Sequence, residues 1–405
     1  MYFPRSPLYR PLVIAFLLGA ACIRLANAND GYALSAIGPA HRGIAGAGVS
    51  SPENSTWILV NPAGIAGMER QLDFYAEALL VERFVIPRGV FPLVNVFAGK
   101  DVDDANLAFA SFSLTFPLQN DWTLGTGLIA LGGTSVNFDT PRTFLSVPMN
   151  ADRRSGYEVA QVPLILAKEF DNGWSVGFGV IGNVQRLRTD ALTLNLRPAE
   201  GDHAWDYAYG GGFALGVQWR GEHWSLGGGY YSRQWVTDFK KYPDIIKYNL
   251  DVPQRLQVGA GYHPNERWDF LLDYKFIHYS SVRQLGTGAL RSGISWQDHH
   301  SVKAGVRFRP TERWTLRAGV SQGQSPIVDE AVFMNAQFPA LVETMASAGF
   351  SYGIRENVDL HFAYSWTKPE TRRENGQGDL FSILGRGTEI GLKTHAFSAG
   401  LTYRF

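Results

Sequence analysis

The sequence predicts an all-β protein: a transmembrane β-barrel of fourteen antiparallel strands, with an N-terminal plug segment in its lumen. Three observations predict this fold. Segments of about ten residues alternate between apolar and polar or small side chains. Five short polar turns are each followed directly by Trp. After residue 28, no apolar run approaches the ~18 residues of a membrane-spanning helix. Only a closed barrel spans a membrane without helices, because backbone polar groups must be paired in lipid.

The composition of the 405 residues excludes several other classes of protein. Lys+Arg and Asp+Glu are equal at 37 each, so there is no electrostatic footprint for nucleic acid. A single Cys excludes a disulfide framework and a multi-cysteine metal site. The chain is 45% hydrophobic, too much for a disordered protein. The 44 Gly and 13% aromatic residues suggest many strands joined by tight turns.

Residues 1–28 read as a cleavable signal peptide. Arg5 and Arg10 form its basic start, residues 11–23 its apolar stretch, and Ala26-Asn27-Ala28 fits the small-x-small cleavage pattern. The alternatives are a membrane anchor and a lipoprotein signal at Cys22. Cleavage after Ala28 removes three Arg and no acid, which leaves a net charge of −3 and no cysteine. The protein is therefore expected to be exported to the bacterial outer membrane.

The segment 29–70 has little alternation and is dense in Gly and Ala. Its Gly43-Ile44-Ala45-Gly46-Ala47-Gly48 stretch superficially suggests a phosphate loop, but no strand precedes it and no Lys-Ser/Thr follows it. A barrel of this size leaves a lumen that is filled or conducts water. Because small residues pack closely, we interpret 29–70 as a plug inside the barrel formed by 71–405.

Period-two alternation defines the predicted strands. In the last of them, for example, Phe397, Leu401 and Phe405 share one face while Ser398 and Thr402 occupy the other. A soluble sandwich would alternate similarly. The predicted strands cover residues 71–82, 107–117, 122–133, 157–170, 174–188, 205–219, 224–236, 254–263, 268–280, 298–309, 314–323, 343–353, 358–369 and 394–405.

The turns separate a membrane barrel from a sandwich. The five turn tryptophans recur every 44 to 52 residues, about one hairpin with its connections. A Trp that opens each returning strand lies at constant height, as in the aromatic girdle of a membrane barrel. The short turns are then periplasmic and the long connections extracellular. These tryptophans are Trp122, Trp174, Trp224, Trp268 and Trp314.

Three N-terminal motifs carry a family resemblance. Gly31-Tyr32, then the Arg42 to Gly48 stretch, then Asn61-Pro62-Ala63-Gly64-Ile65-Ala66 resemble the N-terminal hatch of the FadL family. These are outer-membrane transporters of long-chain fatty acids and other hydrophobic compounds, including aromatic hydrocarbons. The predicted barrel and the terminal Phe405 extend the resemblance over the mature chain. It implies passive uptake through a plugged 14-stranded barrel, with release through a lateral opening in the wall.

The resemblance also implies roles for individual residues. Asn61, Pro62 and Ala63, with Gly43, Gly46 and Gly48, would form and gate the hatch. Pro62 fixes its φ and suits a defined turn, and Asn61 can hydrogen-bond neighbouring backbone. The family's lateral opening arises from a kink in the third strand. Gly132 and Gly133 end that strand here and are candidate kink residues, because glycines mark bulges and bends. Alternatively, they begin the next loop.

Ligand-binding candidates are of two kinds. Charged residues of both signs on the inward faces favour pairing with each other and with the plug. Alternatively, Arg307 or Arg317 holds a ligand carboxylate, since a guanidinium can bind one bidentately. Aromatic residues in the predicted loops are candidates for capture, or else pack among the loops; these are Phe84, Phe91, Phe97, Phe138, Phe144, Phe333 and Phe338. We expect no metal, cofactor or catalytic residue.

The predicted function is passive uptake of hydrophobic small molecules such as long-chain fatty acids by a monomeric channel. It would lie among outer-membrane lipid and lipopolysaccharide and bind no nucleic acid. Movement of the hatch around Asn61-Pro62-Ala63 would weaken the ligand site and let the ligand leave sideways. Three alternatives remain: an aromatic-hydrocarbon channel of the same family, a general porin for polar solutes, and an outer-membrane lipase or esterase. The hydrolase is disfavoured because no Gly-x-Ser-x-Gly elbow occurs.

Overall fold

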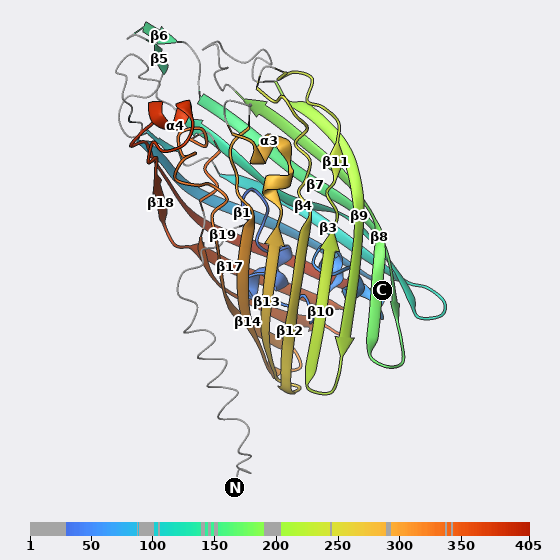
Figure 1. The fold of residues 1–405 in the computed structure, drawn as a ribbon. Helices are drawn as coiled ribbons and strands as arrows, with labels where there is room; N and C mark the ends of the chain where they lie inside the picture. Colours follow the sequence, from blue (N-terminus) through green and yellow to red (C-terminus); the bar gives the residue numbers. More distant parts are fainter. Residues whose placement is uncertain are drawn as a thin grey trace.

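One continuous antiparallel sheet closes on itself in the computed structural model of this chain (Figure 1). Closure is made by the first and last strands, which pair from Gln71↔Arg404 to Ile86↔Glu389. The structure describes residues 30–86, 88, 101–103, 106–138, 142–144, 147–149, 153–189, 204–243, 245–288, 293–336, 338–341 and 343–405.

The sheet contains seventeen hydrogen-bonded segments. Three of them are short outer continuations of other strands: β2 (Asp101–Asp103) of β3, β11 (Trp235–Val236) of β10, and β18 (Glu370–Arg373) of β17. Fourteen wall strands remain, so the predicted barrel is confirmed. They are β1 (Gln71–Ile86), β3 (Leu107–Pro117), β4 (Trp122–Phe138), β7 (Arg153–Glu169), β8 (Trp174–Thr189), β9 (Asp206–Arg220), β10 (Trp224–Tyr231), β12 (Arg255–Asn265), β13 (Trp268–Ile277), β14 (His299–Thr311), β15 (Trp314–Gly323), β16 (Thr344–Arg355), β17 (Val358–Thr367) and β19 (Glu389–Arg404).

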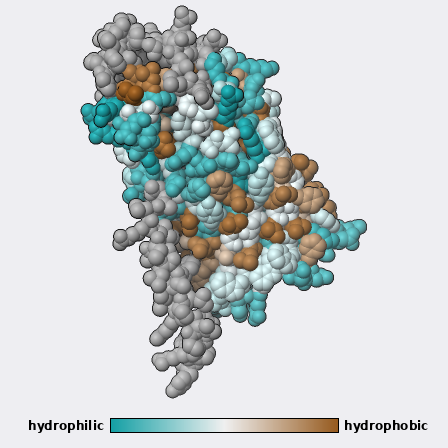
Figure 2. Space-filling model, in the orientation of Figure 1, coloured by the Kyte–Doolittle hydropathy of each residue, from teal (hydrophilic) through white to brown (hydrophobic). Residues whose placement is uncertain are grey.

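Alternation places apolar side chains on the outside of the wall. In β17, Phe362 is 42% exposed while its neighbour His361 is buried, and the same pattern repeats along the other strands. Figure 2 shows these apolar residues gathered over the wall between hydrophilic ends. Strands β4, β8, β10, β13 and β15 each begin at one of the turn tryptophans, as the sequence predicts. Among the described residues, no helix is both long and apolar enough to cross a membrane.

Strand boundaries differ from expectation at the long-loop end of the barrel, the end opposite the short turns. The third strand, β4, runs on to Phe138, and the last, β19, begins at Glu389. The extension of β19 carries a charged residue, Lys393, which pairs with Glu82 at the end of the predicted first strand. Apolar alternation is lost there, although the backbone ladder continues.

The predicted strand 224–236 is interrupted. β10 ends at Tyr231 and β11 resumes at Trp235. Between them Ser232 still bonds Phe213 of β9, but the next residues pair with a loop: Gln234 exchanges backbone hydrogen bonds with Val252, and Arg233 forms an ion pair with Asp251. The remaining short helices and strands lie at the long-loop end. They are β5 (Arg142–Phe144), β6 (Val147–Met149), η4 (Tyr279–Ser281), α3 (Arg283–Gly286) and α4 (Leu380–Leu384).

Residues 30–66 fill the lumen. They form α2 (Gly38–Gly43), η1 (Ser55–Leu59) and η2 (Pro62–Ile65), drawn in blue inside the barrel in Figure 1. Almost every one of these residues is buried. We call residues 30–34 the plug tip and residues 50–66 the plug base.

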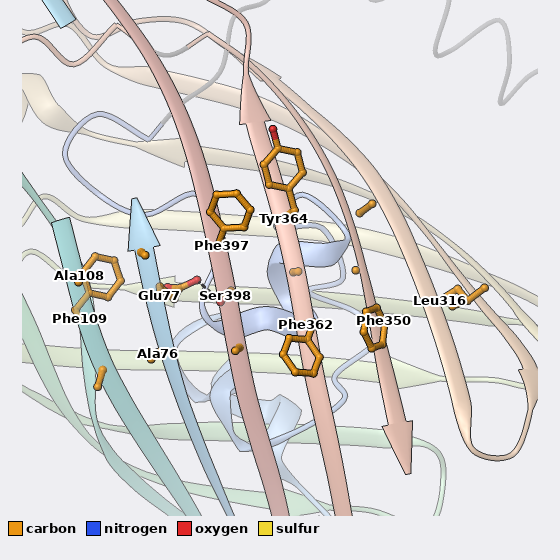
Figure 3. A pocket seen from close by; sticks show the side chains of 16 residues that line it. Ala76, Glu77, Ala108, Phe109, Leu316, Phe350, Phe362, Tyr364, Phe397 and Ser398 are labelled. Atoms are coloured by element: carbon orange, nitrogen blue, oxygen red, sulfur yellow. Dashed lines mark hydrogen bonds between the residues drawn. The ribbon is translucent and has the colours of Figure 1, made fainter. Parts of the chain in front are cut away.

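A shallow groove of about 950 Å³ lies on the outer face of the wall (Figure 3). Small residues such as Ala76, Ala108 and Ala348 form its floor, and the rings of Phe350, Phe362, Tyr364 and Phe397 stand beside it. In Figure 3 the plug lies behind the strands, so this groove is separate from the lumen.

Candidate functional site

The lumen is apolar toward the long-loop end. Loops fold inward there and bury large side chains in one cluster with the plug tip. Aromatic members of this cluster come from the plug, from β7, and from the β11–β12 and β13–β14 connections; they are Tyr32, Tyr157, Phe239, Tyr242, Tyr279 and Trp296. A ligand entering from this end would therefore meet an apolar interior that leads to the plug tip.

The lumen is polar toward the short-turn end. A cavity of about 720 Å³ there is lined by side chains of both signs, and most of them are paired. Arg309 lies 2.7 Å from Asp269 across neighbouring strands, measured from nitrogen to oxygen. Arg404 donates to Asp359 at 2.5 Å. Transfer of a hydrocarbon chain into such a cavity is unfavourable, since it would desolvate paired charges.

The plug base is fixed by its shape and by hydrogen bonds. The Asn61 side chain accepts from the Ala63 N–H at 3.0 Å and donates to the carbonyls of Val49 and Val217 at 3.0 and 3.1 Å. It therefore caps η2 and joins the plug to β9. Pro62 opens η2 against Gly177 and Gly216 of the wall, where a Cβ would overlap the plug backbone. The Asn61-Pro62-Ala63 motif is thus packed into the wall through glycine contacts.

The predicted plug glycines also lie in close packing. Gly43 ends α2 against Arg317. Gly46 has a φ of +78°, and a side chain there would overlap the Ser35 carbonyl. The Gly48 carbonyl accepts from the indole N–H of Trp57 at 2.8 Å. All three residues are buried.

Arg317 and Arg307 hold an acid of the plug base. Arg317 binds Glu53 through both its Nε and Nη2 atoms, and Arg307 Nη1 lies 3.6 Å from Glu53 Oε1. Burial raises the pKa of Glu53, but the two guanidiniums outweigh it and lower that pKa to about 2. A ligand carboxylate would have to displace Glu53 to reach either arginine, so their predicted ligand role stays a prediction.

The plug also joins the two strands that close the barrel. Glu77 of β1 accepts from Arg42 of the plug and from Ser398 of β19, both at 2.7 Å. Nearby, Asp73 of β1 accepts from the Ser55 backbone at 2.9 Å and from the Thr402 hydroxyl. Each of these β1 carboxylates therefore forms hydrogen bonds with the plug and with β19.

Ion pairs hold the plug tip. The Asp30 carboxylate forms an ion pair with the Lys275 ammonium of β13. It also lies 3.4 Å from the Lys303 ammonium and 3.2 Å from His299 Nε2, both of β14. Asp30, Lys303 and His299 are completely buried. Burial raises the pKa of Asp30, but Lys275 and Lys303 reverse this and hold it well below its usual value. We call Lys275, Lys303 and His299 the cationic cradle.

The Tyr32 ring of the plug tip packs among Tyr157, Tyr279 and Trp296, which we call the aromatic box. The Tyr32 ring centroid lies 5.2 Å from that of Tyr157 at 86°, and 5.8 Å from that of Tyr279 at 68°. Trp296 lies 6.2 Å away. Edge-to-face pairs at these distances contribute roughly 0.5–1.5 kcal/mol each beyond burial.

The third strand is bulged where it meets the tip. The β4–β7 register shifts between Ala130 and Gly132. There the tip pairs with β4: the Leu34 N–H donates to the Leu131 carbonyl at 2.8 Å, and the Gly133 N–H donates to the Tyr32 carbonyl at 3.0 Å. A Cβ at Gly132 would overlap the Tyr32 carbonyl. Both predicted kink residues thus contact the tip.

The ladder between β3 and β4 stops at the same level. It runs from Pro117↔Thr123 to Phe112↔Leu128, and no further register pair joins β3 to β4 among the described residues. Instead, the Ala130 N–H donates to the Ser111 hydroxyl at 3.0 Å. In the described part of the chain, β3 and β4 therefore form no ladder beyond Leu128, beside the plug tip.

The aromatic candidates are not brought together at this site. Phe84 lies in β1, half-buried over Gly391 of β19. Phe338 packs against the apolar cluster, and Phe333 lies over Gly385. Phe91 and Phe97 fall outside the described residues. For Phe138 and Phe144 the structure describes only the backbone, at the end of β4 and in β5.

Sequence reasoning placed Gly31-Tyr32 in the hatch but missed the contacts of the plug tip with the wall. Asp30 and Tyr32 are single residues in a short irregular stretch, without periodicity. One signal was present: Lys275 and Lys303 occupy inward positions on neighbouring strands, and buried ammonium groups need a counterion. No group of three or more His, Cys, Asp or Glu that could hold a metal occurs among the residues described.

Solved structures share this fold. A FadL homologue from Pseudomonas aeruginosa has 15% identity and a TM-score of 0.68, covering 93% of this chain and 100% of its own. The Pseudomonas putida toluene transporter TodX has 15% identity and a TM-score of 0.72, covering 93% and 99%. The Ralstonia pickettii toluene transporter TbuX has 17% identity and a TM-score of 0.66, covering 92% and 99%. At such identities the likeness establishes the fold alone.

No curated protein matches the chain at comparable significance. A family model does match, over residues 18–405, and is described as outer membrane protein transport protein (OMPP1/FadL/TodX). It covers the plug and all fourteen wall strands. Together with the plugged barrel, this match shows that the chain belongs to the FadL/TodX family of outer-membrane transporters of hydrophobic compounds.

Proposed function

We propose that this protein is a passive channel that takes up hydrophobic compounds, long-chain fatty acids among them, and releases them sideways into the outer membrane. The observation that carries the proposal is the asymmetry of the lumen. Its long-loop half is an apolar cluster that ends at the plug tip, while the half beyond the plug is a charged cavity. An apolar ligand thus has a favourable path inward and an unfavourable one straight through.

The interrupted strand pairing offers the sideways exit. It lies beside the tip, where β4 is bulged and β3 is no longer paired with it. The tip covers this place from inside through its hydrogen bonds to Leu131 and Gly133. Displacement of the tip would therefore open the ligand site and uncover the exit together.

The moving part in this proposal is the tip. The sequence led us to expect movement around Asn61-Pro62-Ala63, but that motif is packed against Gly177 and Gly216 and joined to β9. The tip is instead a short segment whose ion pairs, ring contacts and hydrogen bonds could be replaced by those of a ligand. Uptake is downhill, since apolar burial of about 25 cal/mol per Å² supplies affinity without an energy source.

Uptake in whole cells tests the proposal. Cells that lack other such transporters would express the full-length chain, and accumulation of radiolabelled oleate would be compared with that in empty-vector cells. We expect faster accumulation that saturates with oleate concentration. The control is a variant that keeps the barrel and locks the tip by a disulfide to β4; reducing agent should restore its uptake. Equal uptake with and without the protein would overturn the proposal.

Aromatic hydrocarbons are the second candidate substrate class. The aromatic box around Tyr32 favours a ring, and two of the similar solved structures are described as toluene transporters. Toluene accumulation in the same cells tests this candidate. A toluene rate well above that of oleate would assign the channel to aromatic compounds.

Direct measurements would test two further activities. A general porin predicts steady currents of tens of picoamperes in planar bilayers, whereas a plugged barrel predicts almost none. A lipase or esterase predicts turnover of a chromogenic ester by the purified protein, lost on replacement of one Ser or His. We expect neither result.

A further inference from the structure

The plug tip presents two chemical groups to the wall, one residue apart. Asp30 offers a carboxylate and Tyr32 an aromatic ring. The wall sites that bind these two groups are adjacent, because Tyr279 contacts both of them. Its hydroxyl donates to the Asp30 carbonyl, and its ring packs against Tyr32. The wall therefore binds an acid and a ring in one continuous site.

The cationic cradle requires an anion. The Lys303 side chain is fully buried and that of Lys275 is 10% exposed, and both point at the Asp30 carboxylate. Asp273, opposite Lys303 on β13, is already engaged by the Val49 N–H and by Gln257. If Asp30 leaves without a replacement, two buried ammonium groups lose their main counterion, which is strongly unfavourable. A neutral hydrocarbon cannot compensate for this loss, and a carboxylate can.

The aromatic box favours a ring over a flexible chain. Tyr157 and Tyr279 meet Tyr32 near edge-on, and Tyr279 meets Trp296 at 85°. This geometry uses the positive edge of one ring against the negative face of another. A saturated chain or ring would fill the space but would not form these contacts.

The site has no room for a ligand while the tip is docked. The Asp30 side chain is fully buried against Lys303, and Tyr32 is only 7% exposed. The tip itself therefore fills the cradle and the box. Tip and ligand must therefore exclude each other.

We propose that the cationic cradle and the aromatic box form a binding site for aromatic carboxylates, and that the Asp30–Tyr32 segment is a built-in stand-in for such a ligand. The inference rests on the proposed uptake function and deepens it by naming a substrate class that joins both candidate chemistries. The ligand carboxylate replaces that of Asp30 on Lys275 and Lys303. Its ring replaces that of Tyr32, which also releases the tip from β4.

Three matched probes test the site on the full chain purified in an uncharged detergent. The probes are 3-phenylpropanoate, propylbenzene, which lacks the acid, and 3-cyclohexylpropanoate, which lacks the aromatic ring. We expect 3-phenylpropanoate to bind at least about tenfold more tightly than either, as measured by equilibrium dialysis. Equal binding of all three would overturn the inference.

Variants in the tip and in the cradle should act in opposite directions. Asp30→Asn weakens the internal competitor and should raise affinity for 3-phenylpropanoate, whereas Lys303→Met removes a ligand contact and should lower it roughly tenfold or more. Lys303→Arg keeps the charge and should restore part of the affinity. Lys240→Met, on an exposed lysine, is the matched control and should change nothing. A fall in affinity with Asp30→Asn would contradict the stand-in role.

Cell uptake separates failure of this inference from failure of the proposed function. If the cells accumulate oleate or toluene but the purified protein does not prefer 3-phenylpropanoate, the channel stands and the aromatic-acid site is wrong. If no hydrophobic probe accumulates although 3-phenylpropanoate binds as expected, the uptake function is wrong.

Discussion

The two ends of the plug are held by different kinds of contact. The plug base is held by close packing, hydrogen bonds and an ion pair. η2 packs against wall glycines, Asn61 bonds to backbone of the plug and of β9, and Glu53 is bound by two arginines. The plug tip is held by one carboxylate, one ring and two hydrogen bonds to a bulged strand. A single small molecule with an acid and a ring can reproduce the main contacts of the tip, whereas the base combines packing, backbone hydrogen bonds and an ion pair. This difference is why we propose the tip as the gate and the base as its support.

The largest expected effect comes from expelling the tip with Gly132→Val. The new side chain would overlap the Tyr32 carbonyl, and overpacking of about 1–3 kcal/mol shifts the docking equilibrium by roughly 5- to 150-fold. Planar-bilayer conductance should rise accordingly. Gly182→Val on β8 is the matched control, since its Cβ would lie at an ordinary 3.6 Å from the Val162 carbonyl. If both variants conduct equally little, the tip is not the gate.

Loss of the ion pair in the base should affect stability instead of gating. Glu53→Gln leaves Arg307 and Arg317 buried without their shared counterion, and we expect about 3 kcal/mol less free energy of unfolding in urea. Glu82→Gln, in an exposed pair with Lys393, is the control and should cost less than about 1 kcal/mol. A Glu53→Gln protein that is fully stable but conducts freely would reverse the roles assigned to the two ends.

A smaller loss is expected from Asn61→Ala. The change removes two hydrogen bonds between plug and neighbouring backbone and the cap of η2, at about 1–2 kcal/mol in all. The measurement is again urea unfolding, with Asn172→Ala in an exposed turn for comparison. If Asn61→Ala leaves ligand affinity unchanged, the role of the Asn61-Pro62-Ala63 motif is purely structural. A large change in affinity would show that the plug base takes part in gating as well.

The smallest effect is expected from mild acid. The pKa of Glu53 is lowered to about 2, and that of Asp30 is also held well below its usual value. A carboxyl with a lowered pKa stabilises the fold above its unfolded value, and this contribution is lost as pH falls through the folded value. From pH 7 to pH 5 the loss per group is therefore only about 0.2 kcal/mol. Conductance that opens at pH 5 would show that another group controls the plug.

The barrel was predictable from sequence because its signals are local. A turn followed by Trp marks where five strands begin, and period-two alternation marks the membrane-facing part of each. The outer strand ends were underestimated, since charged residues such as Arg83 and Lys393 break the apolar alternation while the ladder persists to Ile86↔Glu389. The break after Tyr231 depends on a loop residue, Val252, and could not be read locally.

The site was only partly predictable because its partners are distant in sequence. Gly132 and Gly133 were identified from composition, but their contact with Tyr32 depends on how the plug is threaded. The partners of Asp30 lie 245 and 273 residues away, on two neighbouring strands. Inward position on a strand follows from sequence, whereas the choice among several inward charges requires the register and the plug conformation.

The seam between β1 and β19 has a consequence for biogenesis. Glu77 and Asp73 each bond to the plug as well as to the last strand. A closed barrel without the plug would deprive these carboxylates, and Lys303, of their plug partners and leave them only wall partners and water. Closing the cylinder and inserting the N-terminal segment are therefore thermodynamically coupled steps of maturation. A chain whose N-terminal segment is misplaced keeps the ladder between its first and last strands but lacks the plug bonds at that seam, so we expect unplugged, leaky barrels to be less stable.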